Sequence, residues 1–306
     1  MKILVATEKP FAKTATDGIK KISDEAGYTV TFLEEYTDVN DLYKAVADAN
    51  ALIVRSDKVT KEVIDAAKHL QIVVRAGAGY DNIDLQACSD RNIVVMNTPG
   101  QNSNAVAELV IGMMIFMARN HFQPGTGTEL KGKKIGLHAY GNVGKLVAPL
   151  AKSFGMEVYA FDPYIAPEII EKDGVIPVKN VEELFSTCQY VSLHIPATPE
   201  TKQSINYHLI SKMPKNACLI NTARKEVMNE ADLFKIMNDR PDIKYITDIM
   251  PDMHADLINQ FGTRYFSTAK KIGAETAEAN INAGLAAAKQ IIRFFQHGDK
   301  TFQVNK

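Results

Sequence analysis

The chain has few of the features that would assign it to a specialised class of protein. Its 306 residues include no tryptophan and only three cysteines, and its basic and acidic residues balance to a formal net charge of -1. A balanced charge without a basic block provides no electrostatic attraction for nucleic acid. The apolar segment 106–117 is too short to span a membrane. We therefore expect a protein that acts on small molecules, with no nucleic-acid partner and no membrane partner.

The cysteines and the first residues argue against secretion and against a metal centre. Cys88, Cys188 and Cys218 are odd in number, lack the spacing of metal ligands, and lie in apolar segments, so we expect buried thiols. The opening residues MKILVATEKP predict a strand and a loop, whereas a signal segment would have a charged start followed by a cleavable apolar stretch. The sequence therefore favours a cytoplasmic protein with no bound metal.

Short apolar runs alternate with helical segments in two parts of the chain. Such alternation predicts parallel sheets with helices on both faces, and the length suits two domains. We therefore predict an α/β protein with two doubly wound parallel-sheet domains. The predicted strands are residues 2–7, 28–34, 51–56, 72–77 and 93–98 in the first part, and 134–139, 157–162, 190–195, 217–222, 244–249 and 264–269 in the second.

Residues 133–162 have the order of a dinucleotide-binding unit: an apolar run, the turn YGNVG, a helical segment, and a second apolar run that ends in Asp162. The turn would direct the amides of Asn142 and Val143 toward a pyrophosphate. Asp162 could hold both ribose hydroxyls, which favours NAD over NADP. Ala139 replaces the first glycine of G-x-G-x-x-G, so we expect a negative φ there. An ordinary strand-to-helix turn is the alternative interpretation.

Two helical segments indicate how the domains connect. Residues 106–117 are apolar on nearly every face, which predicts a buried helix. This helix either links the domains and adds a dimer contact, or packs only within a core. The last helix, residues 277–295, is expected to return to the first domain and complete it. The dinucleotide-binding unit is therefore predicted to be inserted into another domain.

Six segments at predicted strand ends resemble, in this order, motifs of the D-2-hydroxyacid dehydrogenase family. The resemblance implies a Rossmann NAD domain, residues 97–279, inserted into a flavodoxin-like substrate domain of residues 1–96 and 280–306. It implies hydride transfer to NAD from C2 of a small phosphorylated 2-hydroxy acid, 3-phosphoglycerate, and a homodimer formed through the NAD domain. The segments are RAGAGYDNID (75–84), NTPGQNSNAVAEL (97–109), AYGNVG (139–144), LHIPATPETK (193–202), INTARKEV (220–227) and KIGAETAEANINAG (271–284).

The resemblance also implies which residues bind the substrate carboxylate. Arg224 resembles the catalytic arginine of the family, and its guanidinium offers a fork of donors that suits both the carboxylate and the C2 oxygen. A surface arginine that caps a loop is the alternative. Gly77, Ala78 and Gly79 would bring backbone amides close to the same carboxylate.

The phosphate requires cations, and predicted strand ends of the first part supply them. Arg55, Ser56 and Arg75 are expected to bind it, because the V-R-S and R-A-G stretches resemble substrate-facing segments of the family. Lys9 and Lys58 could equally be solvated surface charges. The chain ends without the C-terminal extension of longer family members, so feedback control through such a domain is not expected.

Matching positions along the second part imply the contacts with NAD. His194 corresponds to the cofactor-side L-H-x-P of the family, while His138 and His254, the latter placed in a polar loop, are expected to be structural or solvated. The full predicted set is Tyr140, Gly141, Asn142, Val143, Asp162, Pro163, His194, Pro196, Thr201, Thr222, Ala223, Asp248, Gly273 and Ala274.

The chain departs from the family pattern at the catalytic base. The expected histidine falls on Lys271 and its partner glutamate on Met253. Either the protein binds NAD without catalysis, as a corepressor-like relative would, or Lys271 performs the acid and base chemistry. A lysine, with an ordinary pKa of ~10.4, needs that pKa lowered, and the loss of the carboxylate at position 253 is consistent with this need. Partial burial and Arg224 are expected to lower it further.

Overall fold

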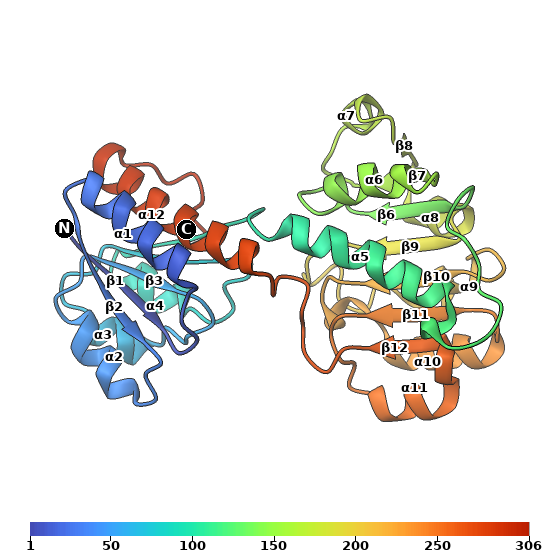
Figure 1. The fold of residues 1–306 in the computed structure, drawn as a ribbon, viewed down its shortest axis with the longest axis horizontal. Coiled ribbons are helices and arrows are strands. Elements are labelled where there is room, and N and C mark those ends of the chain that lie inside the picture. Colours follow the sequence, from blue (N-terminus) through green and yellow to red (C-terminus); the bar gives the residue numbers. More distant parts are fainter. Residues whose placement is uncertain (306) are drawn as a thin grey trace. The chain divides into compact units, whose positions relative to one another are not determined.

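The computed structural model describes residues 1–305 and divides into two compact units (Figure 1). Unit 1 comprises Met1–Asn102 and the chain from Glu275 onward, and unit 2 comprises Ser103–Ala274. The boundaries proposed from the sequence, at residues 97 and 279, lie a few residues from the observed ones at 103 and 274. Both sheets are parallel throughout, which confirms the predicted fold class.

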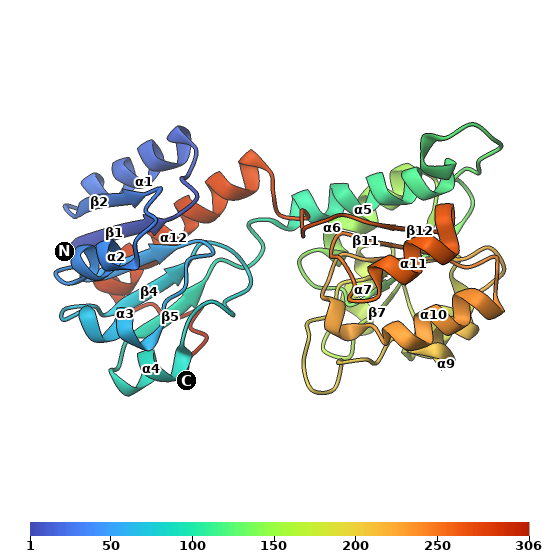
Figure 2. The same cartoon turned by 90° about the horizontal axis from the view of Figure 1, so that it is seen from below.

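Unit 1 contains a five-stranded sheet in the order β2-β1-β3-β4-β5, which is the flavodoxin-like order. Side chains alternate between the two faces of a strand, so each face carries its own apolar cluster. Helices α1 and α12 cover one face, and α2, α3 and α4 cover the other (Figure 2). Helix α4 was not predicted. The elements are β1 (Lys2–Thr7), α1 (Lys13–Glu25), β2 (Thr29–Glu34), α2 (Val39–Val46), β3 (Ala51–Val54), α3 (Lys61–Ala66), β4 (Ile72–Arg75), α4 (Leu85–Asp90), β5 (Val94–Asn97) and α12 (Ala277–His297).

The end of the chain covers the free edge of β5. The amide of Val304 donates to the Val95 carbonyl (2.8 Å), and the buried Asn305 side chain accepts from the Val95 amide (2.7 Å) and donates to the Ile93 carbonyl (2.8 Å). An exposed strand edge is a template for unwanted pairing. These contacts satisfy part of that edge and tie the chain end to the sheet.

Unit 2 contains a seven-stranded sheet in the order β12-β11-β10-β9-β6-β7-β8. The chain adds β7 and β8 on one side of β6 and then adds β9 to β12 on its other side. The boundary between the parallel neighbours β6 and β9 is therefore the switch point of a Rossmann sheet. Helices α5 and α6 cover one face, and α8 to α11 cover the other. All six predicted runs form strands, and β8 was missed because it has only two residues. The strands are β6 (Lys134–His138), β7 (Glu157–Phe161), β8 (Ile176–Pro177), β9 (Tyr190–Leu193), β10 (Cys218–Asn221), β11 (Lys244–Thr247) and β12 (Tyr265–Ser267).

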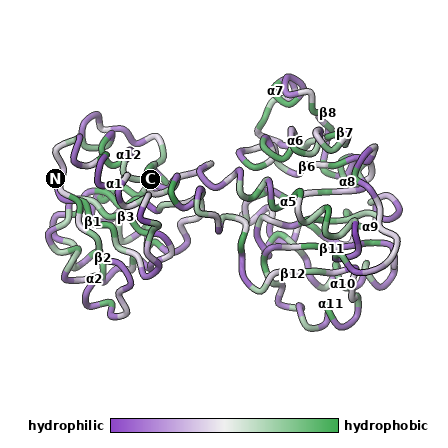
Figure 3. The backbone as a smooth tube through the Cα atoms, viewed as in Figure 1, coloured by the Kyte–Doolittle hydropathy of each residue, from purple (hydrophilic) through white to green (hydrophobic). Residues whose placement is uncertain are grey.

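Helix α5 is buried as predicted, with Val110, Met114 and Met117 among its fully or nearly fully buried residues. It packs into the apolar cluster of unit 2, and hydrophobic residues follow it and the central strands in Figure 3. The helices of unit 2 are α5 (Ser103–Ala118), α6 (Gly144–Ser153), α7 (Pro167–Lys172), α8 (Val181–Thr187), α9 (Tyr207–Ser211), α10 (Glu230–Asp239) and α11 (His254–Phe261), with short turns η1 (Asn120–Phe122), η2 (Lys225–Val227) and η3 (Gly262–Arg264).

The cysteines agree with the expectation of buried thiols. Cys88, Cys188 and Cys218 are free and buried, and burial raises the pKa of each thiol to about 12. Across residues 1–305, no helix has the length and apolarity needed to cross a membrane.

Candidate active site and cofactor site

The glycine-bearing turn between β6 and α6 is tightly packed and strained at its first residue. Ala139 has φ of 82°, so the expected negative φ is wrong. Its amide donates to the Phe161 carbonyl (2.9 Å). Its own carbonyl oxygen packs so closely on Gly144 that a Cβ at position 144 would lie only 2.5 Å from it. The close approach of the helix start to Ala139, together with the β7 hydrogen bond, holds this left-handed conformation, which costs an alanine about 1 kcal/mol.

The start of α6 offers backbone donors to an anion. Val143 is the N-cap residue, and no side chain caps the helix there. The first amides of a helix have no intrahelical acceptors, and the helix dipole favours negative charge beside them. The space beside Gly141 is open, and Asn142 is exposed. The open turn and the uncapped helix start are compatible with the pyrophosphate of a dinucleotide, and the contacts predicted for Gly141, Asn142 and Val143 stay predictions.

Asp162, which follows β7, is held by two backbone amides. Its Oδ2 accepts from the Tyr140 amide (2.8 Å) and its Oδ1 from the Tyr164 amide (2.9 Å). These bonds fix the carboxylate beside the turn, where it could receive ribose hydroxyls next to Pro163. The Tyr140 ring is fully buried, and its hydroxyl donates to Asp173 (3.0 Å). Tyr140 therefore holds the carboxylate of Asp162 in place, and its predicted contact with a cofactor stays a prediction.

Further along the carboxyl edge of the same sheet, buried polar atoms lack partners. His194 Nε2 and Thr222 Oγ1 have no hydrogen-bond partner in the described part of the chain. Burial lowers the pKa of His194 to about 3 and that of His138 to about 4, so both rings are neutral near pH 7. Buried polar atoms without partners are rare unless a ligand satisfies them. Their position after β9 and β10 fits the polar groups of NAD.

The loop after His194 is closed by its own side chains. Thr201 Oγ1 donates to the Pro196 carbonyl (2.5 Å) and accepts from the Thr198 amide (2.8 Å). These contacts give Thr201 a role in shaping the loop, and its predicted contact with the cofactor stays a prediction.

Lys271 lies among three acceptors at the ends of β10 and β11. Its Nζ donates to the carbonyls of Thr222 and Ala223 (both 3.0 Å) and to Asp248 Oδ1 (3.1 Å). Burial is the main cause that lowers the pKa of Lys271, and the charge of Arg224 lowers it further, whereas Asp248 and the more distant Glu226 raise it. The two expected causes of lowering are both present.

Lys271 has a carboxylate beside it, although position 253 does not supply it. Asp248 is fully buried, and its second oxygen accepts from the Gly273 amide (2.8 Å). A Cβ on Gly273 would lie 2.7 Å from that oxygen, so only glycine permits this contact. Met253 packs against the apolar cluster at the start of α11 and supplies no charge. Asp248, rather than position 253, therefore provides the acidic partner.

Arg224 follows β10 on a turn that a neighbouring asparagine shapes. The buried Asn221 side chain accepts from the Ala223 amide (2.9 Å) and donates to the Arg224 carbonyl (3.0 Å). The Arg224 guanidinium makes one hydrogen bond with described residues, to the Ala223 carbonyl (3.1 Å). Its remaining donors are therefore available to a ligand. Sequence reasoning missed Asn221, although the polar residue that ends an apolar run was a signal for it.

His254 lies outside this group. It is the first residue of α11 rather than part of a polar loop, and its Nδ1 lies 2.9 Å from the Tyr265 hydroxyl. Its place at the start of a helix corrects the expected polar loop, and its contact with Tyr265 agrees with the expected structural role.

In unit 1, Arg55 is already bound by the protein. Its guanidinium donates to the carbonyls of Lys9 (3.1 Å) and Pro10 (3.3 Å) and to Asn280 Oδ1 (2.7 Å). It also lies 5.3 Å from the centre of the Phe11 ring. These contacts orient Arg55 at the carboxyl end of β3 and occupy donors that a phosphate would otherwise use.

Arg75 and the glycine-bearing loop after β4 are packed together. Arg75 Nε donates to the Arg55 carbonyl (3.0 Å). A Cβ on Gly77 would lie 1.3 Å from Arg75 Nη1, so the guanidinium occupies the space that a side chain at position 77 would need. Gly77 has φ of 149°, so it is required both by conformation and by space. The Ala78 carbonyl accepts from Asn97 (2.6 Å), which fixes the loop that continues to Gly79.

Asp57, which sequence reasoning missed, organises this edge of unit 1. The nearly fully buried carboxylate accepts from the amides of Glu8 (2.6 Å) and Arg55 (3.2 Å) and from the Tyr36 hydroxyl (3.1 Å). It therefore ties together the loops after β1, β2 and β3, including the turn that carries Ser56. Lys9 and Lys58 are exposed, without an ion pair among residues 1–305.

Comparison with known proteins agrees with this geometry. The NAD-binding domain of the D-isomer specific 2-hydroxyacid dehydrogenases matches residues 110–260. The chain is 35% identical over 271 residues to D-3-phosphoglycerate dehydrogenase from Methanocaldococcus jannaschii, covering 82% of this chain and 51% of that protein. It is 34% identical to hydroxypyruvate reductase from Thermotoga maritima, covering 85% of this chain and 89% of that protein.

A solved structure extends the similarity over the whole chain. The NAD+-bound 3-phosphoglycerate dehydrogenase of Entamoeba histolytica is 51% identical, with a TM-score of 0.89, and the match covers 100% of this chain and 99% of that one. The chain spans about half the length of several curated phosphoglycerate dehydrogenases that it matches. With a relative 34% identical and 89% covered, and with the NAD-binding domain in place, this chain belongs to the D-isomer specific 2-hydroxyacid dehydrogenase family.

Proposed function

We propose that this protein oxidises D-3-phosphoglycerate at C2 with NAD to give 3-phosphohydroxypyruvate, the reaction that opens serine synthesis. The observation that carries the proposal is the group formed by Arg224, Lys271 and Asp248 at the carboxyl edge of the sheet that bears the glycine turn. The similarity to the 3-phosphoglycerate dehydrogenase of Entamoeba histolytica supports the choice of substrate.

Arg224 and Lys271 divide the work on the substrate. The free donors of Arg224 bind the substrate carboxylate and the C2 oxygen, because a planar guanidinium pairs with two oxygens at once. Lys271 as a neutral amine accepts the proton of the C2 hydroxyl, and as an ammonium returns it in the reverse direction. The turn and Asp162 would hold NAD, which would accept the hydride from C2.

Asp248 sets the balance between the two directions. The two carbonyls and the carboxylate around Lys271 Nζ favour the ammonium, while burial and Arg224 favour the amine. Reduction of the keto acid requires the ammonium, which donates a proton to the ketone. Oxidation of the alcohol requires the amine and should become faster as the pH rises.

The substrate phosphate is proposed to be bound in unit 1 by Arg75, Ser56 and Arg55. The three acceptors that hold Arg55 make it a positioning residue as well as a cation, since they keep it at the end of β3. Ala78 and Gly79 are proposed to donate amides to the carboxylate. The predicted role of Gly77 as a donor is corrected, because its buried amide already donates to the Arg75 carbonyl (2.9 Å).

We also propose that the protein is a cytoplasmic homodimer formed through unit 2. Phe116, His121 and Phe266 form an aromatic cluster beside α5, with Phe116 and His121 stacked at 4.4 Å. Phe122 packs on this cluster and is 67% exposed. A second copy of unit 2 would bury this apolar surface.

Reduction of hydroxypyruvate or glyoxylate is the second candidate function. The match to the Thermotoga maritima hydroxypyruvate reductase covers 89% of that protein, and Arg55 is already occupied by protein acceptors. A corepressor-like protein that binds NAD without turnover is the third candidate.

One assay separates these candidates. NADH formation is followed spectrophotometrically with 3-phosphoglycerate, D-glycerate and 4-phosphoerythronate, and the reverse reaction with hydroxypyruvate and glyoxylate. Strong preference for 3-phosphoglycerate over D-glycerate supports the proposal. Equal kcat/KM for both acids would favour the second function, and NAD binding without turnover of any substrate would favour the third.

A further inference from the structure

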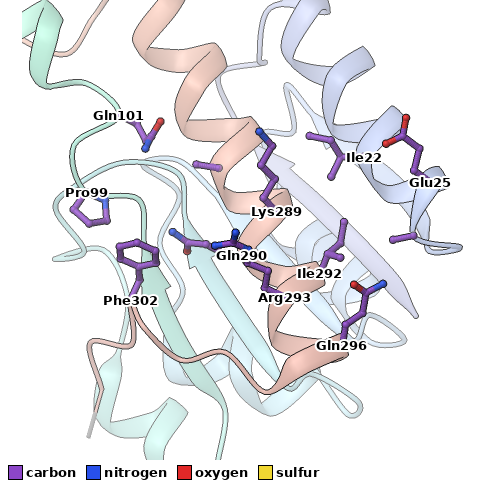
Figure 4. Close-up of a pocket in the computed structure, with 12 residues that line it drawn as sticks. Ile22, Glu25, Pro99, Gln101, Lys289, Gln290, Ile292, Arg293, Gln296 and Phe302 are labelled. Carbon is purple, nitrogen blue, oxygen red and sulfur yellow. The ribbon is translucent and has the colours of Figure 1, made fainter.

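A cavity of about 550 Å³ opens on unit 1 over the outer face of α12, and it contains none of the residues of the candidate site (Figure 4). Ala286, Gln290 and Arg293 lie on its floor at spacings of three and four, so they share one helix face. The opposite face of α12 packs in the core through residues such as Ala287 and Ile291. The helix therefore belongs to the core on one side and to the cavity on the other.

The floor carries two cations without counter-ions. Lys289 and Arg293 lie one turn apart, and neither has an acid within ion-pair distance anywhere in residues 1–305. Glu25, the acid that lines the cavity, pairs with Lys21 of its own helix (4.0 Å). Asp299, which is half-buried, interacts electrostatically with Arg293 but lies beyond ion-pair distance of its guanidinium. The positive charge of the floor is therefore open to an external anion.

The walls of the cavity are apolar. Ile22 of α1 lies on one side, and Pro99 and Phe302 lie on the other, with the cations between them (Figure 4). Glu25, Gln101 and Gln296 are the remaining polar residues of the lining. Phe302 is 36% exposed. Cavities of roughly 300 to 1,000 Å³ with apolar walls and a few polar groups are typical of small-molecule sites. The volume, the walls and the charge all select for the same type of ligand.

We propose that this cavity binds a small organic anion: a carboxylate or phosphate group carried on an apolar or aromatic body. The anionic group contacts Arg293 and Lys289, and the body lies against Phe302 and Pro99. A guanidinium and an ammonium one turn apart suit either acid, since both present several acceptor oxygens.

The ligand would also act on the segment by which the chain leaves unit 1. Gln290 Nε2 donates to the Asn97 carbonyl at the end of β5 (3.0 Å), and Pro99 and Gln101 line the cavity just before unit 1 ends at Asn102. A bound anion would restrict this segment. Amide hydrogen exchange of Thr98 and of residues 100–102 should therefore slow on binding, independently of any effect on turnover.

The first test uses 8-anilinonaphthalene-1-sulfonate, a fluorescent aromatic anion, with the full chain and with saturating NAD to fill the other predicted site. Lys289→Ala combined with Arg293→Ala should weaken its binding at least about ten-fold, because two charge-assisted contacts are lost. The matched control is Lys13→Ala combined with Lys20→Ala, which removes the same charge from the exposed face of α1. The control should bind the probe within about two-fold of wild type. Equal binding by both double variants would overturn the proposal.

The second test identifies the anionic group and does not depend on the charge variants. Phenyl phosphate and 3-phenylpropanoate are used to displace the probe, with neutral 3-phenylpropanamide as the comparison. At least one of the two anions should displace the probe at a concentration at least about ten-fold lower than the amide. The stronger competitor shows whether the site prefers a phosphate or a carboxylate. Ala286→Trp, which fills the floor and keeps both cations, should abolish displacement and the exchange protection. Competition by the amide as strong as by both anions, or full binding in Ala286→Trp, would refute the site.

Discussion

The ammonium of Lys271 lies 3.1 Å from a carboxylate oxygen of Asp248, and this is the one ion pair of residues 1–305 whose acid is fully buried. The opposite oxygen of Asp248 is held by the Gly273 amide, so the carboxylate cannot turn away from the lysine. Burial and Arg224 act against this contact by lowering the pKa of Lys271. The proton on Lys271 is therefore controlled by opposing influences that can be removed one at a time.

Replacement Asp248→Asn should move the rise of kcat for oxidation to lower pH. Asp248 raises the pKa of Lys271, so its neutral replacement lowers that pKa and makes the amine available earlier. A shift of about one pH unit corresponds to ~1.4 kcal/mol of lost interaction. The pH profile of kcat at saturating NAD and substrate measures it. Glu226→Gln is the matched control and should shift the profile less, and a shift to higher pH would contradict the assignment.

Replacement Lys271→Met should lower kcat by about 100-fold to 10,000-fold while NAD still binds, since this is the usual contribution of general acid–base catalysis. Lys271→Arg should be nearly as inactive, because a guanidinium keeps its proton. Lys271→His should regain weak activity, improved by adding Met253→Glu. Steady-state rates and NAD titration by fluorescence test this set, and wild-type rates in Lys271→Met would exclude the lysine as the base.

Asp162 should determine the preference for NAD over NADP. Its carboxylate is fixed by the amides of Tyr140 and Tyr164, so a 2'-phosphate would meet a like charge that cannot move away. Asp162→Ala should weaken the binding of NAD. The ratio of kcat/KM with NAD to kcat/KM with NADP should fall by at least about ten-fold, as expected for loss of charged hydrogen bonds. Equal use of NADP by the unaltered protein would show that Asp162 has another role.

The positive φ of Ala139 predicts an unusual response to glycine. Ala139→Gly should leave the free energy of unfolding unchanged or raise it by up to about 1 kcal/mol, because relief of the left-handed strain offsets the added freedom of the unfolded chain. Ala286→Gly, in the interior of α12, should lower the free energy of unfolding by about 1 kcal/mol. Urea unfolding compares the two variants, and a similar loss in both would mean that Ala139 has a negative φ in solution.

Removal of Arg75 should separate phosphorylated from unphosphorylated substrates. Arg75→Ala should raise KM for 3-phosphoglycerate by about ten-fold to a hundred-fold and that for D-glycerate much less, given roughly 1.5 to 3 kcal/mol for a charged hydrogen bond. Arg55→Ala should do the same and also lower the free energy of unfolding, since the loop at Lys9 and Asn280 in the first turn of α12 lose their donor. Equal changes in KM for both acids would argue against a phosphate site here.

Much of the fold followed from local pattern. The strands β6, β9, β10 and β11 appear as short apolar runs because strands buried on both faces of a parallel sheet must be apolar along their whole length. The polar residues that end such runs, Asn221 and Asp248 among them, mark the sheet edge where ligands bind. Strand β8 escaped prediction because two residues carry no periodicity.

The sequence by itself determined that two parallel sheets form and that Arg224 and Lys271 follow strands of the second one. Only the tertiary structure decided what surrounds them. Asp248 reaches Lys271 across 23 residues, Asn280 reaches Arg55 across 225, and the start of α6 holds Ala139 at a φ that its residue type disfavours. Hydrophobic periodicity reports which face of an element is buried, whereas hydrogen-bond partners and strained backbone angles depend on how separate segments pack against one another.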